Sequence, residues 1–280
     1  PDGISGEFLK SLPENFMRLF LQVFNQIIEG KTPPRAWGDI ELVMLYKKGD
    51  LNDPGNYRGI SLISHGCKWF TQILLDRLNK WCEESGIMCE TQAGFRKTRG
   101  CEDLLFTRNS IVNDFLYRKA ALYVAYVDYE KAFDSVEHDI LWSKLFNLGI
   151  SGQMVRTIKN LYEHAGAIIR LEKGFSKKIN INCGVLQGEL LSPLMFNLFT
   201  NDFEAAFSPR NCITMKLSST CFIHSLRYAD DTAILAHDPG SLKNKLEALR
   251  NFCEVNKLRV NVEKTKIMIF SKSGRIGYTK

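Results

Sequence analysis

Two adjacent carboxylates, Asp230 and Asp231, lie between two short apolar runs, Cys221 to Leu226 and Ala233 to Ala236. Two carboxylates forced close together in a partly desolvated turn raise each other's pKa unless cations or hydrogen-bond donors hold both in the ionised form. A tight β-hairpin that presents the pair to a divalent metal ion meets this requirement. A solvated Asp-Asp turn is the alternative, because Asp is a common turn residue. The pair alone leaves both interpretations open.

A third carboxylate, Asp128, directly follows the uncharged, β-rich run Leu122 to Val127. A buried strand that ends in a carboxylate is typical of a site built at the edge of a sheet. Phosphoryl transfer with two metal ions uses acids from separate strands to bridge cations that are roughly 3.5–4 Å apart. Asp128 and Asp230 are therefore predicted to share a metal site.

The charge of the chain favours an anionic partner. The 280 residues carry a formal net charge of +6, and 45% of them are hydrophobic, which is enough for a large core. The basic residues gather in three clusters, a pattern that suits a polyanion. The clusters are Arg96, Lys97 and Arg99; Lys173, Lys177 and Lys178; and Lys257, Arg259, Lys264, Lys266, Lys272, Arg275 and Lys280.

The cysteines and the apolar runs indicate the compartment. None of the eight cysteines forms a Cys-x-x-Cys pair, and Cys221 with His224 has no second pair of plausible zinc ligands. We therefore expect reduced thiols. The longest wholly apolar run, Ala120 to Val127, is too short to span a bilayer, and the sequence does not open with a signal peptide. These features predict an intracellular protein that is neither secreted nor bound to a membrane.

The order of the predicted elements indicates an α+β fold with an antiparallel sheet that carries the acids and packs on helices. Ser11-Leu12-Pro13-Glu14 resembles a capping box, and residues 52–59 read as a loop. Apolar periodicity predicts helices at 16–27, 67–81, 104–116, 140–148, 153–162, from Ser192 onward and at 242–255. It predicts strands at 40–46, 122–127, 167–171, 177–182 and 267–270, besides the Asp-Asp hairpin.

An ordered series of motifs around the acids resembles a reverse transcriptase, and more narrowly the polymerase domain of non-LTR, LINE-type retrotransposons. The central motifs are Asp128-Tyr129-Glu130-Lys131-Ala132-Phe133-Asp134-Ser135-Val136, Gly184-Val185-Leu186-Gln187-Gly188, Leu191-Ser192-Pro193 and Tyr228-Ala229-Asp230-Asp231. Flanking motifs are Pro1-Asp2-Gly3-Ile4, Tyr46-Lys47-Lys48-Gly49-Asp50, Asn56-Tyr57-Arg58-Gly59-Ile60-Ser61-Leu62, Gln92-Ala93-Gly94-Phe95-Arg96 and Asn261-Val262-Glu263-Lys264-Thr265-Lys266. The resemblance covers nearly the whole chain.

The resemblance implies a right-hand polymerase fold with fingers at residues 1–120, including an N-terminal helix, and a palm at residues 121–280. A nucleotide pocket is expected between them, with the thumb largely absent and no endonuclease segment. Asp128, Asp230 and Asp231 correspond to the catalytic, metal-binding acids. Two Mg²⁺ ions, for which Mn²⁺ is a possible substitute, would assist the transfer of a nucleotide to a primer.

The resemblance also implies partners for the nucleotide. Lys47 and Arg58 match triphosphate-binding residues of the fingers, and their cationic side chains suit phosphate. Phe133 matches the steric gate against a ribose 2′-hydroxyl, while Gln187 and Gly188 match the segment that supports the new base pair. Lys264 matches a lysine near the departing pyrophosphate. Gln92, Gly94 and Arg96 match the template-side block of the fingers.

One position departs from the family pattern. Glu189 occupies a place where the family usually has a smaller residue, and a carboxylate beside a triphosphate is expected to weaken nucleotide binding unless the side chain faces solvent. The implied function is RNA-directed DNA synthesis with an RNA template, a DNA primer and dNTPs, in the nucleus or a cytoplasmic ribonucleoprotein. The alternatives are an intron-maturase-like or RNA-copying polymerase, and a catalytically silent, domesticated RNA-binding scaffold. The chain is expected to be a fragment.

Overall fold

The chain forms two compact units, each built from two separate segments. A computed structural model describes residues 3–171, 173–207, 212–216 and 222–272, so Pro1, Asp2 and Cys221 of the motifs above lie outside the described residues. Unit 1 comprises Pro1–Ser85 and Glu137–Met195, and unit 2 comprises Gly86–Val136 and Phe196–Lys280. The sequence predicted one division at residue 120, whereas the units alternate along the chain. The assignment of fingers and palm stays a prediction.

Four helices of unit 1 confirm the predictions from apolar periodicity: α2 (Glu14–Ile28), α3 (His65–Glu84), α5 (His138–Asn147) and α6 (Gly152–Glu163). The short helix α1 (Gly6–Lys10) and the 3-10 turns η1 (Arg35–Trp37) and η2 (Pro54–Asn56) were not predicted. The predicted capping box at Ser11 is wrong. Ser11 ends α1, and Pro13 occupies the N-cap of α2 without a side-chain hydrogen bond.

Unit 1 also contains a mixed sheet in the order β2-β1-β4-β5. Its strands are β1 (Asp39–Tyr46), β2 (Tyr57–Leu62), β4 (Gly166–Ile169) and β5 (Ile179–Asn180). The β1 and β4 strands are parallel, and the other pairs are antiparallel. The sequence predicted a loop through Gly59, but Gly59 lies within β2 opposite Met44. Pairing with β1 supplies the strand that local composition did not indicate.

Aromatic rings and aliphatic side chains form the core of unit 1. The ring of Phe24 in α2 lies 5.1 Å from that of Phe70 in α3, and Trp37 lies 5.7 Å from Phe70. Ile40 of β1 and Ile63 pack with Cys67 near the start of α3. The helices and the sheet of this unit are therefore joined by buried apolar contacts.

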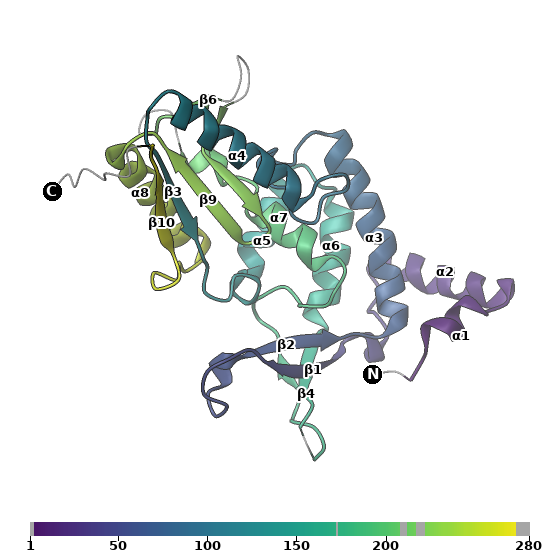
Figure 1. Ribbon diagram of the computed structural model, residues 1–280. Helices are drawn as coiled ribbons and strands as arrows, with labels where there is room; N and C mark the ends of the chain where they lie inside the picture. The colour runs from purple at the N-terminus through teal and green to yellow at the C-terminus, as the bar shows by residue number, and fades with distance from the viewer. Residues whose placement is uncertain (1–2, 172, 208–211, 217–221, 273–280) are drawn as a thin grey trace. The chain divides into compact units, whose positions relative to one another are not determined.

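Unit 2 is built on an antiparallel sheet in the order β10-β3-β9-β8 (Figure 1). The strands are β3 (Leu122–Val127), β8 (Ser225–Tyr228), β9 (Asp231–Ala236) and β10 (Lys266–Phe270), and β6 (Met215–Lys216) pairs separately with β7 (Phe222–Ile223). All pairs in the larger sheet are antiparallel. The predicted α+β fold with an antiparallel sheet that carries the acids is confirmed.

Helices cover the sheet of unit 2, and Figure 1 shows α4 (Cys101–Tyr117) crossing over it. Ile111 of α4 packs in one cluster with Val124 and Leu235 of the sheet. Ala125 and Ile234 alternate to the other face and are also fully buried. The α8 helix (Pro239–Asn256) contacts β9 and β3.

Three shorter elements complete the fold. The α7 helix (Ser192–Phe199) contains the point at which the chain passes from unit 1 to unit 2. The 3-10 turns η3 (Phe133–Ser135) and η4 (Glu204–Ala206) belong to unit 2. Within the described ranges, no helix combines the length and the apolarity needed to cross a membrane.

Candidate active site

The Asp230-Asp231 pair lies at a two-residue hairpin between β8 and β9. Tyr228 and Asp231 form the last pair of the ladder, so Ala229 and Asp230 make the turn. Ala229 has a φ of +57°. Positive φ at the first central residue is typical of the primed turns that join tight hairpins, a position that usually contains Gly. An alanine there costs roughly 1–2 kcal/mol, so surrounding contacts must hold this turn.

The register of the sheet brings Asp128 next to this turn. Val127, the last residue of β3, pairs with Thr232 of β9. Asp128 directly follows Val127 and Asp231 directly precedes Thr232, so both acids lie at the same end of this ladder. The main chain of Asp128 is fixed, because its N–H donates to Thr265 Oγ1 at 3.3 Å and its carbonyl accepts from Asn261 N–H at 2.8 Å. The predicted proximity of Asp128 to the hairpin acids is consistent with this register.

The Asp128 carboxylate is suited to a cation. Its Oδ2 atom is buried and accepts no hydrogen bond from any described residue, while Lys264 Nζ lies 3.6 Å from the same oxygen. Carboxylate oxygens are the ligands that Mg²⁺ prefers, so the donor chemistry fits. Within the described part of the chain, however, no three His, Cys, Asp or Glu side chains are grouped to hold a metal ion. The three-acid metal site therefore stays a prediction.

Phe133 lies in η3, a few residues after Asp128. Its ring is half-buried and stacks on the fully buried ring of Phe196 in α7, with centroids 4.7 Å apart and planes inclined by 18°. Stacking on a fixed neighbour limits the rotamers of the Phe133 ring. The ring is therefore held in one orientation, as a steric gate requires, and its role as a gate stays a prediction.

The template-side residues predicted from the sequence lie in the interior of unit 2. Gln92 is 1% exposed, and the Arg96 side chain is 5% exposed and donates to the carbonyl groups of Cys89 and Gln92 at 3.1 and 3.3 Å. Gly94 is buried, and its carbonyl accepts from Asn197 Nδ2 at 2.7 Å. The Gln92 and Arg96 side chains and the Gly94 carbonyl therefore lie among internal contacts, and template binding by these residues stays a prediction.

Lys47 and Arg58 lie on the exposed hairpin of β1 and β2 in unit 1. Arg58 pairs with Leu45, and Lys47 follows two residues later, so alternation puts both basic side chains on the same face. Lys47 N–H donates to Asn56 O at 2.8 Å, which continues the pairing past the end of β1. The sheet of unit 1 therefore presents two neighbouring cations to solvent.

The Gln187-Gly188 segment is attached to β2. Gln187 O accepts from Ser61 N–H at 2.7 Å, and Gly188 has a φ of +107°. A Cβ atom at Gly188 would lie 2.8 Å from Ser61 O, a distance that real Cβ contacts do not reach. Glycine at 188 therefore permits the close approach of this segment to the strand that contains Arg58.

Substitutions at two glycines test the close contact between Gly188 and Ser61. Gly174 also has positive φ, +90°, but has no atom within 4 Å of its ideal Cβ position. Gly174→Ala therefore introduces backbone strain alone, about 1 kcal/mol, whereas Gly188→Ala adds overpacking and costs roughly 1–3 kcal/mol more. Urea unfolding of both variants measures the difference. Equal losses of unfolding free energy would contradict the close contact with Ser61.

Glu189 does not have the position that the sequence suggested. Its side chain is buried in unit 1, where Oε2 accepts from Leu191 N–H at 2.7 Å and from Ser192 Oγ at 3.4 Å. Burial raises the pKa of Glu189 above its ordinary value of 4.5 and favours the neutral carboxyl. The expected carboxylate beside a bound triphosphate is replaced by an inward-facing group that holds the start of α7.

The raised pKa of Glu189 predicts a pH dependence of stability. The folded chain keeps this proton at pH values at which the unfolded chain has lost it, so the contribution is complete below pH 4.5 and falls as pH rises toward the folded pKa. Glu189→Gln removes the dependence. The unfolding free energy of this variant minus that of wild type should grow from pH 4.5 to neutral pH in urea titrations. Exposed Glu163→Gln is the control, and a pH-independent difference would refute the assignment.

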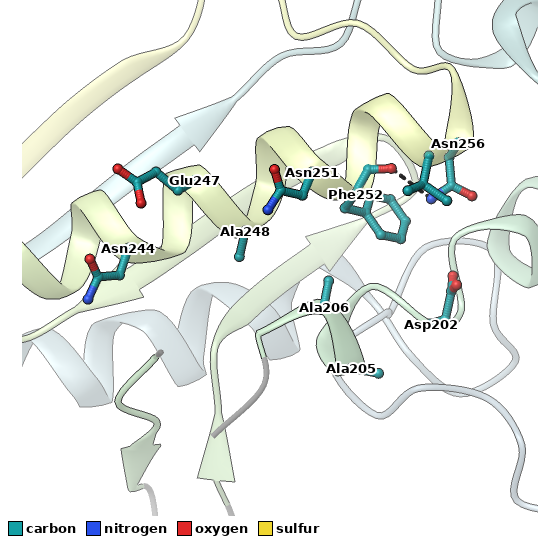
Figure 2. Close-up of a pocket in the computed structure, with 10 residues that line it drawn as sticks. Asp202, Ala205, Ala206, Asn244, Glu247, Ala248, Asn251, Phe252 and Asn256 are labelled. Atoms are coloured by element: carbon teal, nitrogen blue, oxygen red, sulfur yellow. Dashed lines mark hydrogen bonds between the residues drawn. The ribbon is translucent and has the colours of Figure 1, made fainter. Parts of the chain in front are cut away.

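A separate groove of about 620 Å³ runs along α8 in unit 2 (Figure 2). Asn244, Glu247 and Asn251 line it from the helix, opposite Ala205 and Ala206 of η4. None of the predicted site residues lines this groove. Its amide-rich wall offers hydrogen bonds but no pair of closely placed acids, so the candidate chemistry remains with the hairpin.

Comparison with known proteins gives a consistent match. The family model described as "Reverse transcriptase (RNA-dependent DNA polymerase)" matches residues 46–279. The chain is 27% identical over 271 residues to "Probable RNA-directed DNA polymerase from transposon BS" of Drosophila melanogaster, covering 94% of this chain and 29% of that protein. It is 28% identical over 276 residues to "Retrovirus-related Pol polyprotein from type-2 retrotransposable element R2DM" of the same organism, covering 94% of this chain and 24% of that protein. The chain thus spans less than a third of these relatives.

The fold is shared with a solved structure at low sequence identity. Apo telomerase from Candida tropicalis, truncated from its C-terminal domain, superposes with a TM-score of 0.60 at 14% identity. The alignment covers 95% of this chain and 56% of the telomerase chain.

Proposed function

Because this chain belongs to the reverse transcriptase (RNA-dependent DNA polymerase) family, we propose that it copies an RNA template into DNA as the polymerase domain of a non-LTR retrotransposon protein. The observation that carries the proposal is the register of β3 and β9, which brings Asp128 and Asp231 to the same end of the ladder, where the turn contains Asp230. Residues 1–120 are the proposed fingers and residues 121–280 the proposed palm. The proposed setting is the nucleus or a cytoplasmic ribonucleoprotein.

Asp128, Asp230 and Asp231 are the proposed ligands of two Mg²⁺ ions. When bound, the ions would activate the primer 3′-hydroxyl and neutralise charge on the triphosphate and pyrophosphate, and Mn²⁺ is the proposed substitute. Lys264 supports this assignment, because its ammonium group lies 3.6 Å from Asp128 Oδ2 and balances that carboxylate. A cation at this position also suits a site that releases an anionic product.

The chain's own residues are proposed to bind and select the nucleotide. Lys47 and Arg58 would hold the triphosphate, Arg58 with the bidentate geometry of its guanidinium. Phe133, fixed by Phe196, would exclude a ribose 2′-hydroxyl. Gln187 and Gly188 would support the new base pair through main chain that approaches closely. An RNA template, a DNA primer and dNTPs are accordingly the proposed partners.

A second candidate is an RNA-binding scaffold that lacks catalysis. The observation in its favour is that the described residues contain no ready-made group of three metal-binding side chains. The net charge of +6 is compatible with RNA binding by either candidate. The polymerase and the scaffold differ in whether they catalyse nucleotide addition, not in their affinity for RNA.

Primer extension distinguishes the candidates. The purified chain is given an RNA template annealed to a DNA primer, with dNTPs and Mg²⁺, and extension by successive nucleotides is expected. Chelation with EDTA should stop extension, and added Mn²⁺ should restore part of it. RNA binding without metal-dependent extension would favour the scaffold and overturn the proposed function.

A further inference from the structure

The Ala229-Asp230 turn is held by one side chain from a distant part of the chain. Gln92 Nε2 donates to Ala229 O at 3.0 Å, and Ala229 N–H donates to Gln92 Oε1 at 2.9 Å. The same oxygen accepts from Gly94 N–H at 2.9 Å. One amide thus bonds both main-chain polar groups of the residue that directly precedes Asp230.

The turn requires such a partner. In a two-residue hairpin the main-chain groups of the first central residue do not pair within the ladder, and Ala229 is only 8% exposed. A buried N–H and C=O without partners are strongly disfavoured. Ala229 also adopts a φ of +57° without being glycine. Gln92 therefore satisfies the buried groups and holds a conformation that alanine does not favour.

The main chain around Gln92 is itself fixed to the strand that leads into the turn. Arg227 N–H donates to Thr91 O at 2.8 Å, and Ala93 N–H donates to Arg227 O at 2.9 Å, so residues 91–93 run parallel to β8. These bonds fix the distance between the Gln92 amide and Ala229. Main-chain hydrogen bonds therefore hold residues 91–93 against the β8 strand.

Gly94 and Asn197 complete the arrangement. A Cβ atom at Gly94 would lie 2.2 Å from Ala229 N, so only glycine permits this approach. Asn197 Nδ2 donates to Gly94 O at 2.7 Å from α7, and the adjacent Phe196 stacks on Phe133. One turn of α7 thus supports both the Gln92 segment and the ring proposed as the gate.

We propose that Gln92 is a positioning residue that sets the direction of Asp230 by clasping Ala229, with Gly94 and Asn197 as its support. This inference rests on the proposed function for its kinetic consequence, but the clasp itself is measurable without activity. This positioning role of Gln92 differs from the template contact that the sequence suggested. A buried side chain bonded to the turn acts on the orientation of the acid rather than on a nucleic acid.

Three variants and one control test the proposal. Gln92→Met keeps the length of the side chain and removes all three hydrogen bonds of the amide, whereas Gln92→Glu, at a pH at which the new carboxyl is ionised, keeps the acceptor and removes the donor. Ala229→Gly combined with Gln92→Met supplies a residue that tolerates positive φ. The exposed Gln153→Met, in unit 1, controls for the general effect of the substitution.

Hydrogen exchange of the Ala229 amide is the direct measurement. We expect exchange to be slow in wild type and in Gln153→Met, and at least about tenfold faster in Gln92→Met, because this amide loses Gln92 Oε1, its acceptor among the described residues. Exchange at the wild-type rate in Gln92→Met overturns the clasp. If Gln92→Met does not fold, Gln92→Glu decides, because it keeps the acceptor for this N–H but should loosen the carbonyl side of the turn and speed exchange by a smaller factor.

Primer extension then separates positioning from general stability. Gln92→Met should lower kcat about 10- to 100-fold with little change in KM for dNTP, and the added Ala229→Gly should recover part of that loss. A change in KM with kcat unchanged in Gln92→Met would contradict a positioning role for Gln92. So would a double variant that recovers none of the lost kcat. Inactive wild type with slow exchange at Ala229 would refute the proposed function and leave the clasp established.

Discussion

Asp128→Asn should lower the rate of nucleotide addition about a thousand-fold, which corresponds to about 4 kcal/mol of lost transition-state stabilisation. The substitution removes the negative charge from a carboxylate whose Oδ2 atom is buried, lies 3.6 Å from Lys264 Nζ and accepts no hydrogen bond from any described residue. The asparagine has the same size, so the strand and its ladder are retained. Single-nucleotide extension under saturating dNTP measures the effect.

The stability of this variant separates chemistry from folding. The partner lysine is largely exposed, so loss of the ion pair should change the unfolding free energy by less than about 1 kcal/mol. Asp139→Asn, at an exposed aspartate in the first turn of α5, is the matched control and should keep wild-type activity. If Asp128→Asn retains most of the rate, the assignment of Asp128 as a catalytic acid is wrong.

Phe133→Val should remove most of the discrimination against ribonucleotides. The present ring is fixed by its stacking on Phe196, and a smaller side chain leaves room for a 2′-hydroxyl. Loss of a steric contact of this size changes discrimination roughly 10- to 200-fold. The ratio of kcat/KM for dNTP to that for rNTP measures the change, with dNTP addition itself much less affected.

Two comparisons make the Phe133 result specific. Phe133→Tyr keeps the ring and should keep the discrimination, while Phe146→Val, at a ring that is 67% exposed on α5, should have no effect. Unchanged selection between dNTP and rNTP in an active Phe133→Val enzyme would defeat the gate assignment. It would also return the RNA-copying polymerase to consideration.

Local patterns predicted most of the elements because each is encoded by its own residues. The uncharged run Leu122 to Val127 is β3 to the residue, and the helix predicted at 104–116 is α4 with a few residues added at its ends. The β2 strand was missed because Arg58 and Gly59 interrupt its apolar pattern, and its pairing with β1 is a tertiary effect. The capping box failed because Pro13, rather than Ser11, occupies the N-cap of α2 and has no side-chain group to accept a hydrogen bond.

The acids could be predicted from their types and order, whereas the contacts that hold them could not. Gln92 and Ala229 are 137 residues apart, and no local periodicity joins them. A weak signal existed in Asn197, a single amide within the apolar run Leu194 to Phe199, because a polar residue in such a helix requires a buried partner. Glu189 was likewise a polar residue in an apolar setting, and its inward direction depends on α3 and α7 packing around it.

The most direct test is single-turnover addition of one dNTP to a DNA primer on an RNA template, by this chain and by Asp230→Asn, with Mg²⁺ present. We expect metal-dependent addition by the wild-type chain and at least about a hundredfold slower addition by Asp230→Asn, with both chains folded. Addition by the wild-type chain no faster than by Asp230→Asn would contradict the claim that the hairpin carries the chemistry.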